Sequence, residues 1–408
     1  MLLRKLALAG AFALMGSTAM AACAFENTIP LKSLTAGFEA WKSATSAMAE
    51  CGNFTPELDQ EFATKQAAAF GANPSLYHIG GVANETIVPL INGGLIRPLD
   101  DLVAKYGQNL QPNQLIKVDG KIMAIAMMVN TQHLMYRADI FTELGLAVPT
   151  TYDEVLAAAE VIKASGKVEY PLGGTFMAGW NLGEEFVNMY LGLNPVMVNA
   201  DGTPAINNEA GVKTLEMLKA LSAYMDPEYL TSDSTFVQLQ MQQGKIAMAN
   251  LWASRGGAMD DAAESQVVGK VNGAAAPAAV PGGAPATTLW WDGIVIAANI
   301  TDEEAEAAFQ VALEGIDTEM VAANNDDAIW LIPGYTPGRL ADGAIATATA
   351  NPVPPSYPST TTQGLMHSAL GNQLQAFFTA SSAGAAAPRS VRVWLACQAR
   401  ASSTRPVQ

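Results

Sequence analysis

Five of the seven tryptophans in this 408-residue chain lie beside polar residues or glycines, which is an unusual setting for a side chain that fills a core. They are Trp180, Trp252, Trp290, Trp291 and Trp330. A flat aromatic face can stack on the apolar C–H face of a sugar ring, while neighbouring amide, carboxylate and guanidinium groups bind its hydroxyls. Each tryptophan taken alone fits core packing equally well. The five together favour a carbohydrate-binding cleft, and none of them supplies acid or base chemistry.

The residue patterns of common catalytic and metal sites are missing from the sequence. It contains no H-E-x-x-H, G-x-S-x-G or C-x-x-C motif, and none of its G-K pairs has the upstream glycine of a phosphate-binding loop. The histidines His78, His133 and His367 have no ligand spacing, so we expect ordinary surface or core positions for them. Adjacent acids such as Glu184 and Glu185 are expected on a solvated face. The sequence therefore predicts a binding protein without a cofactor or metal, not an enzyme.

Helices and short strands alternate along the body of the chain. The clearest helix begins at the N-cap Thr151, has Glu154 as its capping-box partner and ends at Gly166. Two further helices are expected from about residue 209 and from Thr301. Apolar segments typical of strands lie at 168–172, 245–251 and 291–297. This alternation predicts an α/β fold in which helices cover both faces of each sheet.

The first residues of the chain have the three parts of an export signal. Arg4 and Lys5 form a positive end, an apolar stretch follows, and Ala19-Met20-Ala21 matches the pattern after which signal peptidase cuts. The apolar stretch is too short to span a membrane. We therefore expect residues 1–22 to be a signal peptide and the mature protein to act outside the cytoplasm.

Cys23 and Cys51 are the two cysteines of the body of the chain. An even pair in an oxidising compartment is most simply one disulfide, here between the mature N-terminus and the first helical region. The alternative is a lipoprotein anchor on an acylated Cys23, although Met20 is a poor first residue for such a site.

The formal net charge of −16 argues against nucleic acid as a partner, because so acidic a surface repels phosphates unless basic residues are concentrated somewhere. The one concentration of arginine is an atypical tail, residues 384–408, which contains no Lys, Asp or Glu. We assign no function to this tail. Half of the residues are hydrophobic, which suffices for the cores of about two domains.

Several short segments occur in an order that is more specific than any one of them. They are 94–102 (G-L-I-R-P-L-D-D-L), 134–141 (L-M-Y-R-A-D-I-F), 145–155 (G-L-A-V-P-T-T-Y-D-E-V), 244–252 (G-K-I-A-M-A-N-L-W) and 277–283 (P-A-A-V-P-G-G). Together they resemble extracellular solute-binding proteins of the maltose-binding-protein type, over most of residues 60–378.

The resemblance implies two α/β lobes with a ligand held between them, the type II arrangement of periplasmic binding proteins. Each lobe would be a sheet flanked by helices, and the chain would cross the hinge between the lobes three times. The first lobe would comprise residues 23–130 plus 290–331, and the second 131–289 plus 332–383. The Pro/Gly/Ala-rich segment 273–288 is the best candidate for one crossing, although a surface loop fits it equally well.

Carried over by position, the resemblance also implies ligand contacts. Asn130 would lie at the first crossing, Trp252 at a stacking position after its strand, Trp291 and Asp292 at the second crossing, and Trp330 near the third.

Local chemistry adds Trp180, Asn181 and Arg255 as ligand-binding candidates. His78 is a further candidate, because residues 73–79 stand where the family usually has a P-D-V strand.

The function implied is a periplasmic receptor that captures a mono- or oligosaccharide and delivers it to the permease subunits of an ABC importer in the inner membrane. We expect a monomer. The alternative is a secreted carbohydrate-active enzyme. A receptor for amino acids, polyamines or metal is less favoured, because the candidate cleft is rich in tryptophan rather than in clustered carboxylates or histidines.

Overall fold

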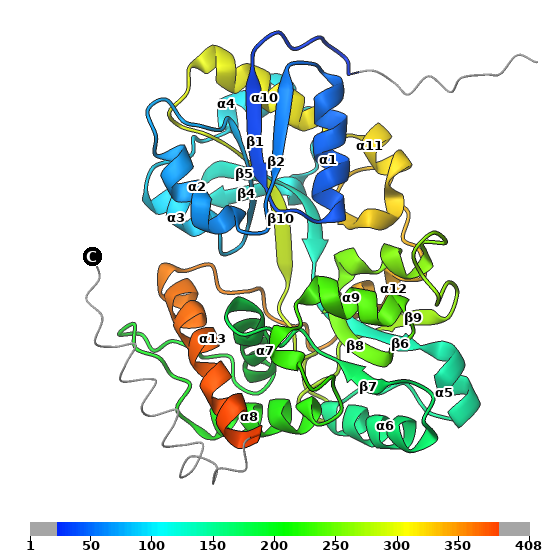
Figure 1. Cartoon of the computed structure of the whole chain (residues 1–408). Helices are drawn as coiled ribbons and strands as arrows, with labels where there is room; N and C mark the ends of the chain where they lie inside the picture. The colour runs from blue at the N-terminus through cyan, green and yellow to red at the C-terminus, as the bar shows by residue number, and fades with distance from the viewer. Residues whose placement is uncertain (1–22, 383–408) are drawn as a thin grey trace, which may run out of the picture.

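The computed structural model describes residues 23–382, so the predicted export signal (1–22) and the Arg-rich tail (384–408) lie outside the described residues. The chain forms two α/β halves, one above the other in Figure 1, and each half is built on its own sheet. We call them the larger-sheet half and the smaller-sheet half. The predicted α/β fold with two sheets flanked by helices is confirmed.

The larger sheet has the strand order β11-β5-β10-β3-β1-β2, and β4 also pairs with β5. Its strands are β1 (Leu31–Thr35), β2 (Phe54–Leu58), β3 (Ile79–Ala83), β4 (Leu115–Val118), β5 (Lys121–Asn130), β10 (Trp290–Ile296) and β11 (Ile329–Trp330). The pairs β1–β2 and β1–β3 are parallel, whereas β10 runs antiparallel to both β3 and β5. Its helices are α1 (Glu39–Glu50), α2 (Phe62–Phe70), α3 (Ile87–Asn92), α4 (Asp100–Tyr106), η1 (Pro112–Gln114), α10 (Asp302–Glu314), α11 (Thr318–Ala323) and η5 (Asn325–Asp327).

The smaller sheet has the strand order β7-β8-β6-β9. Its strands are β6 (Gln132–Arg137), β7 (Tyr170–Gly173), β8 (Ile246–Trp252) and β9 (Val271–Ala274). Its helices are α5 (Ala138–Leu144), α6 (Tyr152–Ser165), α7 (Trp180–Leu191), α8 (Glu209–Ser222), η2 (Tyr229–Thr231), α9 (Ser234–Gln242), η3 (Ala253–Arg255), η4 (Gly257–Asp260), α12 (Asp342–Ala348) and α13 (Thr361–Ser382).

The chain passes repeatedly from one sheet to the other. β5 ends at Asn130 in the larger sheet, and β6 begins at Gln132 in the smaller one. The segment after β9, which contains the Pro/Gly/Ala-rich stretch, leads to β10 of the larger sheet, and the segment after β11 leads to α12. The lobe boundaries and any motion about these links remain predictions.

Helix ends follow the local cap chemistry that the sequence predicts. Thr151 caps α6 with a complete capping box to Glu154, and Gly166 ends this helix with a left-handed φ of 65°. Thr301 and Glu304 form the same box at α10. These two helices and α8 are therefore confirmed. Within residues 23–382, no helix combines the length and the apolarity needed to cross a membrane.

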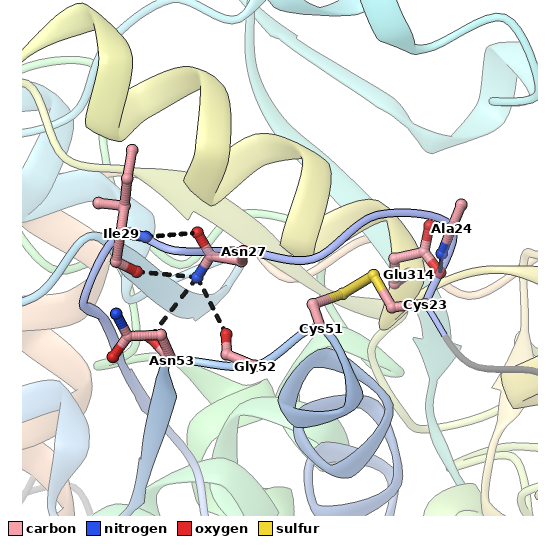
Figure 2. The surroundings of a disulfide bond; sticks show 8 residues. All are labelled: Cys23, Ala24, Asn27, Ile29, Cys51, Gly52, Asn53 and Glu314. Atoms are coloured by element: carbon pink, nitrogen blue, oxygen red, sulfur yellow. Dashed lines mark hydrogen bonds between the residues drawn. A yellow bond between two sulfur atoms is a disulfide. The ribbon is translucent and has the colours of Figure 1, made fainter.

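A disulfide joins Cys23 to Cys51 in the structure, with the Cα atoms 4.9 Å apart (Figure 2). Cys51 is the C-cap residue of α1 and is buried. The side chain of Asn27 joins the segment before β1 to the turn after α1. Its Nδ2 donates hydrogen bonds to the carbonyls of Ile29 at 2.8 Å and Gly52 at 3.0 Å. The disulfide therefore fixes the first described residues against the end of α1.

Replacing both Cys23 and Cys51 with serine should lower the free energy of unfolding by roughly 3 to 4 kcal/mol, because the bond closes a loop of about 30 residues in the unfolded chain. Thermal melting with and without reductant measures this loss. Wild-type protein should melt like the double variant under reductant, and its unreduced mass spectrum should show one free thiol, Cys397. A free thiol at Cys51 or a lipid on Cys23 would contradict the disulfide.

Candidate functional site

Aromatic side chains from distant parts of the chain meet on the smaller-sheet half, next to the larger-sheet half. We call this group, made of Trp180, Trp252, Trp290, Tyr357 and His367, the aromatic cluster. Trp180 is the first residue of α7, Trp252 is the last of β8, and Trp290 is the first of β10. Tyr357 lies in the segment before α13, and His367 lies in α13. The cluster thus depends on elements that are up to 187 residues apart.

The rings of the aromatic cluster pack in a definite order. Trp180 stacks on His367, with ring centroids 5.0 Å apart, and on Trp252, with centroids 6.4 Å apart. Trp290 meets Trp180 and Trp252 edge-on, at 5.7 and 5.9 Å. Trp180 is 37% exposed, whereas Trp252 is only 9% exposed. The sequence predicts Trp252 as the stacking surface, but in the structure Trp180 is the more exposed ring and Trp252 lies behind it.

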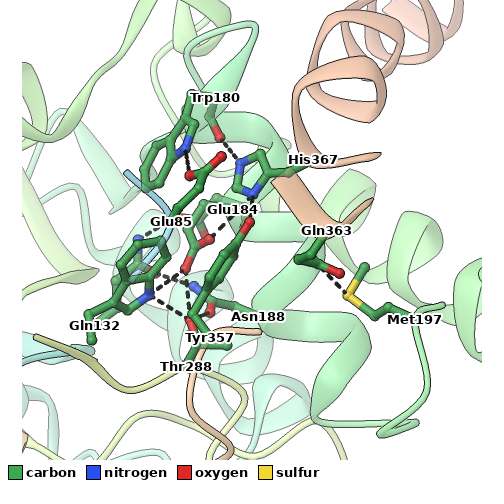
Figure 3. Close-up of polar contacts among 12 residues, drawn as sticks. Glu85, Gln132, Trp180, Glu184, Asn188, Met197, Thr288, Tyr357, Gln363 and His367 are labelled. Carbon is green, nitrogen blue, oxygen red and sulfur yellow. Dashed lines mark hydrogen bonds and ion pairs between the residues drawn. The ribbon is translucent and has the colours of Figure 1, made fainter. Parts of the chain in front are cut away.

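Glu85 reaches the aromatic cluster from the larger-sheet half. It lies in the turn after β3, and its Oε2 accepts a hydrogen bond of 2.8 Å from Nε1 of Trp180 (Figure 3). Gly179, the N-cap of α7, has a φ of 96°, which favours glycine and lets the helix begin directly at Trp180. This contact joins the two halves and places a carboxylate acceptor beside the aromatic rings.

Two further contacts join the halves at candidate residues. Nδ2 of Asn130, at the end of β5, donates a hydrogen bond of 3.2 Å to Oγ of Ser254 in η3. The guanidinium of Arg255 lies 6.0 Å from the ring centroid of Phe38, the N-cap residue of α1. Arg255 also donates to Oγ of Ser234 at 3.0 Å. The structure therefore brings the candidates Asn130 and Arg255 to the boundary on which Trp180 also lies.

The two adjacent tryptophans of β10 have different surroundings. Successive side chains of a strand point to opposite faces, so Trp290 joins the aromatic cluster while Trp291 packs with apolar residues of the larger-sheet half. The predicted site includes Trp291, whereas the ring in the cluster is Trp290. Asp292 is buried in the larger-sheet half, where desolvation raises its pKa to about 7 against the opposing hydrogen bond from Trp41.

Trp330 and His78 are not brought to the aromatic cluster. Trp330 is buried in the core of the larger-sheet half, and its Nε1 donates a hydrogen bond of 2.9 Å to the carbonyl of Asn324. His78 precedes β3, at the end of the strand opposite Glu85, and its Nδ1 accepts a hydrogen bond from the backbone N–H of Lys32. Asn181 follows Trp180 in α7 and is half-buried.

Glu184 and Glu185 of α7 lie inside the protein, so the prediction of a solvated face is wrong for this pair. They are 1% and 6% exposed, because α7 packs against α13 and α8. Burial raises the pKa of Glu184 to about 8 and that of Glu185 to about 7, although hydrogen bonds to both carboxyls oppose these shifts. Both carboxyls therefore favour their neutral forms more than exposed acids do.

Hydrogen bonds connect Glu184 to the aromatic cluster (Figure 3). Its Oε1 accepts bonds of 2.8 Å from Oγ1 of Thr288 and 3.2 Å from Nε1 of Trp290. Its Oε2 has no hydrogen-bond partner among the described residues and lies 3.9 Å from Nδ1 of His367. Glu185 accepts bonds from Thr175 and Gln132 on the other side of α7. The contact of Glu184 with Nε1 of Trp290 therefore supports the aromatic cluster, whereas those of Glu185 involve none of its rings.

Sequence reasoning missed Glu85, Tyr357 and His367 as members of this site. No local motif marks them, and their contacts with Trp180 or with each other depend on the packing of α13 and the turn after β3. The available signal was weak: α13 has no Asp, Glu, Lys or Arg, so its single histidine is chemically distinctive.

One group of metal-ligand side chains occurs within residues 23–382: Cys23, Cys51 and Glu314. The two sulfurs are bonded to each other, so neither is a thiolate that could bind a metal.

Residues 53–314 match the family model described as bacterial extracellular solute-binding protein. The chain is also 38% identical to the multiple sugar-binding protein of Streptococcus mutans over 66 residues, which span 16% of this chain and 15% of that protein.

Solved structures of similar fold cover nearly the whole chain. A solute-binding protein of an ABC transporter from Agrobacterium radiobacter K84, in complex with ribitol, has a TM-score of 0.77 at 21% identity, over 93% of this chain and 99% of that chain. Another from Agrobacterium vitis S4, with bound D-mannitol, has a TM-score of 0.69 at 21% identity, over 91% and 97%. Maltose-bound MalE3 of T. maritima has a TM-score of 0.73 at 17% identity, over 91% and 98%.

Proposed function

This chain belongs to the bacterial extracellular solute-binding protein family, and from that premise we propose that it captures a carbohydrate between its two halves and delivers it to an ABC importer. The ligand would be a neutral mono- or oligosaccharide or a related polyol. The protein would release it unchanged, as a receptor rather than as an enzyme.

The observation that carries this proposal is the aromatic cluster beside Glu85. Trp180 offers a partly exposed indole at the boundary between the halves, and Trp252 and Trp290 support that indole from behind. Sugars and polyols combine apolar C–H groups with hydroxyls, so an aromatic surface next to a carboxylate acceptor suits them. We propose Trp180, Glu85, Asn130 and Arg255 as ligand contacts, and Trp252 as a support of the surface rather than its exposed face.

Contacts from both halves give a physical route from binding to transport. Glu85 and Phe38 belong to the larger-sheet half, whereas Trp180 and Arg255 belong to the smaller-sheet half. A ligand that touches both halves favours their closed arrangement by its differential affinity for the closed and open forms. We propose that the links between the sheets act as the hinge and that the halves are the predicted lobes. The permease would then recognise the closed surface.

The ligands of similar proteins support a neutral, hydroxyl-rich solute. Ribitol, D-mannitol and maltose occupy three of the structures with this fold. The enzyme alternative gains no support at the site, because the carboxyls of Glu184 and Glu185 are buried and engaged by neighbouring hydrogen bonds. We further propose that the mature protein is a periplasmic monomer whose partners are the permease subunits.

Replacing Trp180 with alanine should weaken binding by about 1 to 3 kcal/mol, or roughly 5- to 150-fold, because it removes the exposed aromatic face. Its effect on unfolding should be small, since over a third of this residue is exposed. A thermal-shift screen with ribitol, D-mannitol, maltose and D-galactose selects the ligand, and calorimetric titration then gives the affinity.

Trp330→Phe is the matched control, because Trp330 lies in the core of the larger-sheet half. This variant should melt at a lower temperature and keep the wild-type affinity. The proposed contact is wrong if Trp180→Ala binds the selected sugar as tightly as the wild type does.

A further inference from the structure

His367 is the only titratable side chain on α13, a helix of 22 residues that carries no Asp, Glu, Lys or Arg. It is fully buried, yet it lies directly behind the most exposed ring of the aromatic cluster. A buried imidazole is costly to retain unless its nitrogens have partners. The contacts of both nitrogens therefore indicate what this residue does.

Both ring nitrogens of His367 have defined partners (Figure 3). Nε2 lies 2.8 Å from the carbonyl oxygen of Trp180, and a carbonyl can only accept, so Nε2 carries the proton. Nδ1 is then the acceptor of the neutral ring, and it receives the hydroxyl of Tyr357 at 2.9 Å. The plane of the imidazole is 19° from that of the Trp180 indole. One side chain thus holds Trp180 by both its backbone and its ring.

Glycines on α7 and α13 let the two helices pack closely and still leave room for the imidazole of His367. Position 183 is glycine, and a Cβ there would lie 2.7 Å from Cδ2 of His367, which is too short for any side chain. A Cβ at Gly371 would lie only 2.0 Å from the carbonyl oxygen of Gly179, the residue before Trp180. Glycines at these positions of the two helices therefore allow α13 to approach the start of α7 closely.

We propose that His367 is a positioning residue for ligand capture: by bonding and stacking on Trp180, it holds the indole in the orientation that meets the ligand. This inference rests on the proposed function, because it takes Trp180 as a ligand contact. Without His367, the first turn of α7 would keep its helix, but the exposed ring of Trp180 would lose the contact that holds both its backbone and its indole face. The last helix of the described chain would then control affinity without touching the ligand.

The groups around His367 make this role sensitive to pH. Burial lowers its pKa, against the raising effects of the charge of Glu85 and of the bond to Trp180. The ring also faces Oε2 of Glu184 on α7 and the hydroxyl of Tyr357, while α13 itself adds no charge. Protonation would turn Nδ1 into a donor, which removes the acceptor of the Tyr357 hydroxyl; Glu184, whose pKa is raised to about 8, is already neutral at the pH where the imidazole gains its proton and offers no compensating charge. Lowering the pH should therefore change the surroundings of Trp180 at a higher pH than the one at which the protein unfolds.

His367→Gln and His367→Ala test the proposal, because the side-chain amide of glutamine can donate to the Trp180 carbonyl as Nε2 does. With the sugar selected from ribitol, D-mannitol, maltose and D-galactose, His367→Ala should bind about tenfold more weakly or worse, since the donor to the Trp180 carbonyl and a ring contact are lost. His367→Gln should recover most of that loss. Equal affinities of His367→Ala and wild type would overturn the proposal.

Tryptophan fluorescence without any sugar provides an independent measurement. A protonated imidazole quenches a stacked indole, so wild-type emission should fall in a step below pH 6.5, the ordinary pKa of histidine. The step should be absent from both His367→Gln and Trp180→Phe. A step that persists in Trp180→Phe would show that the two rings are not coupled and would overturn the proposal. If the wild type binds none of the sugars, the proposed function fails, while the fluorescence step still decides whether His367 holds Trp180.

Discussion

Replacing Trp252 with alanine should lower the free energy of unfolding by roughly 3 to 5 kcal/mol, because a large buried side chain is lost and the cavity collapses only in part. Trp252 is 9% exposed and contacts both Trp180 and Trp290. The same variant should also bind sugar at least about tenfold more weakly, since the exposed ring of Trp180 loses its support. Thermal melting without ligand, followed by calorimetric titration, measures the two effects, because bound sugar alone raises the melting point.

Trp252→Phe is the appropriate comparison, since it keeps an aromatic ring at the end of β8 and should lose less on both measurements. An unchanged melting point for Trp252→Ala would show that Trp252 is an open stacking surface and not a support. That result would restore the interpretation expected from the sequence.

Raising the pH from 6 to 9 should destabilise the protein, and Glu184 should account for much of the change. Its pKa is raised to about 8 by burial, so the folded protein holds a proton that the unfolded chain releases above about pH 4.3. This proton contributes its full stabilisation to the free energy of unfolding below about pH 4.3. The contribution is lost as the pH rises through the folded pKa of about 8. The loss should be on the order of a few kcal/mol. Glu185 and Asp292, each with a pKa of about 7, act in the same direction.

Glu184→Gln should lose less stability than the wild type between pH 6 and 9, because the amide resembles the neutral acid in shape and cannot ionise, while Glu185 and Asp292 still titrate in both proteins. Melting curves of the variant and the wild type at pH 6, 7.5 and 9 measure the difference. Glu216→Gln on α8 is a suitable control, since Glu216 is exposed and its loss should leave the pH profile unchanged. Parallel pH profiles for Glu184→Gln and the wild type would contradict a neutral Glu184 in the fold.

Elements with strong local signals could be predicted from the sequence alone. The capping boxes at Thr151 and Thr301 place the starts of α6 and α10, because they depend on side chains three residues apart. The short strands β1 and β3 could not be found this way. β3 is I-G-G-V-A, and its glycines are explained only by distant contacts: a Cβ at Gly81 would lie 2.8 Å from the ring of Trp41.

The candidate site could be predicted only in part, for the same physical reason. The settings of Trp180 and Trp252 indicate binding, but their relative exposure depends on how α7 covers the end of β8. The alternation of side chains along a strand predicts that Trp290 and Trp291 face opposite ways; the resemblance points to Trp291, whereas the ring that packs in the aromatic cluster is Trp290. Glu85 and His367 lie 95 and 187 residues from Trp180, so only the folded chain brings them to it.

The central claim, capture of a sugar without chemistry, is tested most directly by calorimetric titration of the mature protein, followed by mass analysis of the recovered ligand. With ribitol, D-mannitol, maltose and D-galactose as candidates, we expect saturable binding of at least one of them at one site per chain. Burial of apolar surface should make the heat-capacity change of binding negative. The recovered sugar should have its original mass and linkage. Failure of all four to bind, or recovery of a hydrolysed or oxidised product, would contradict the account.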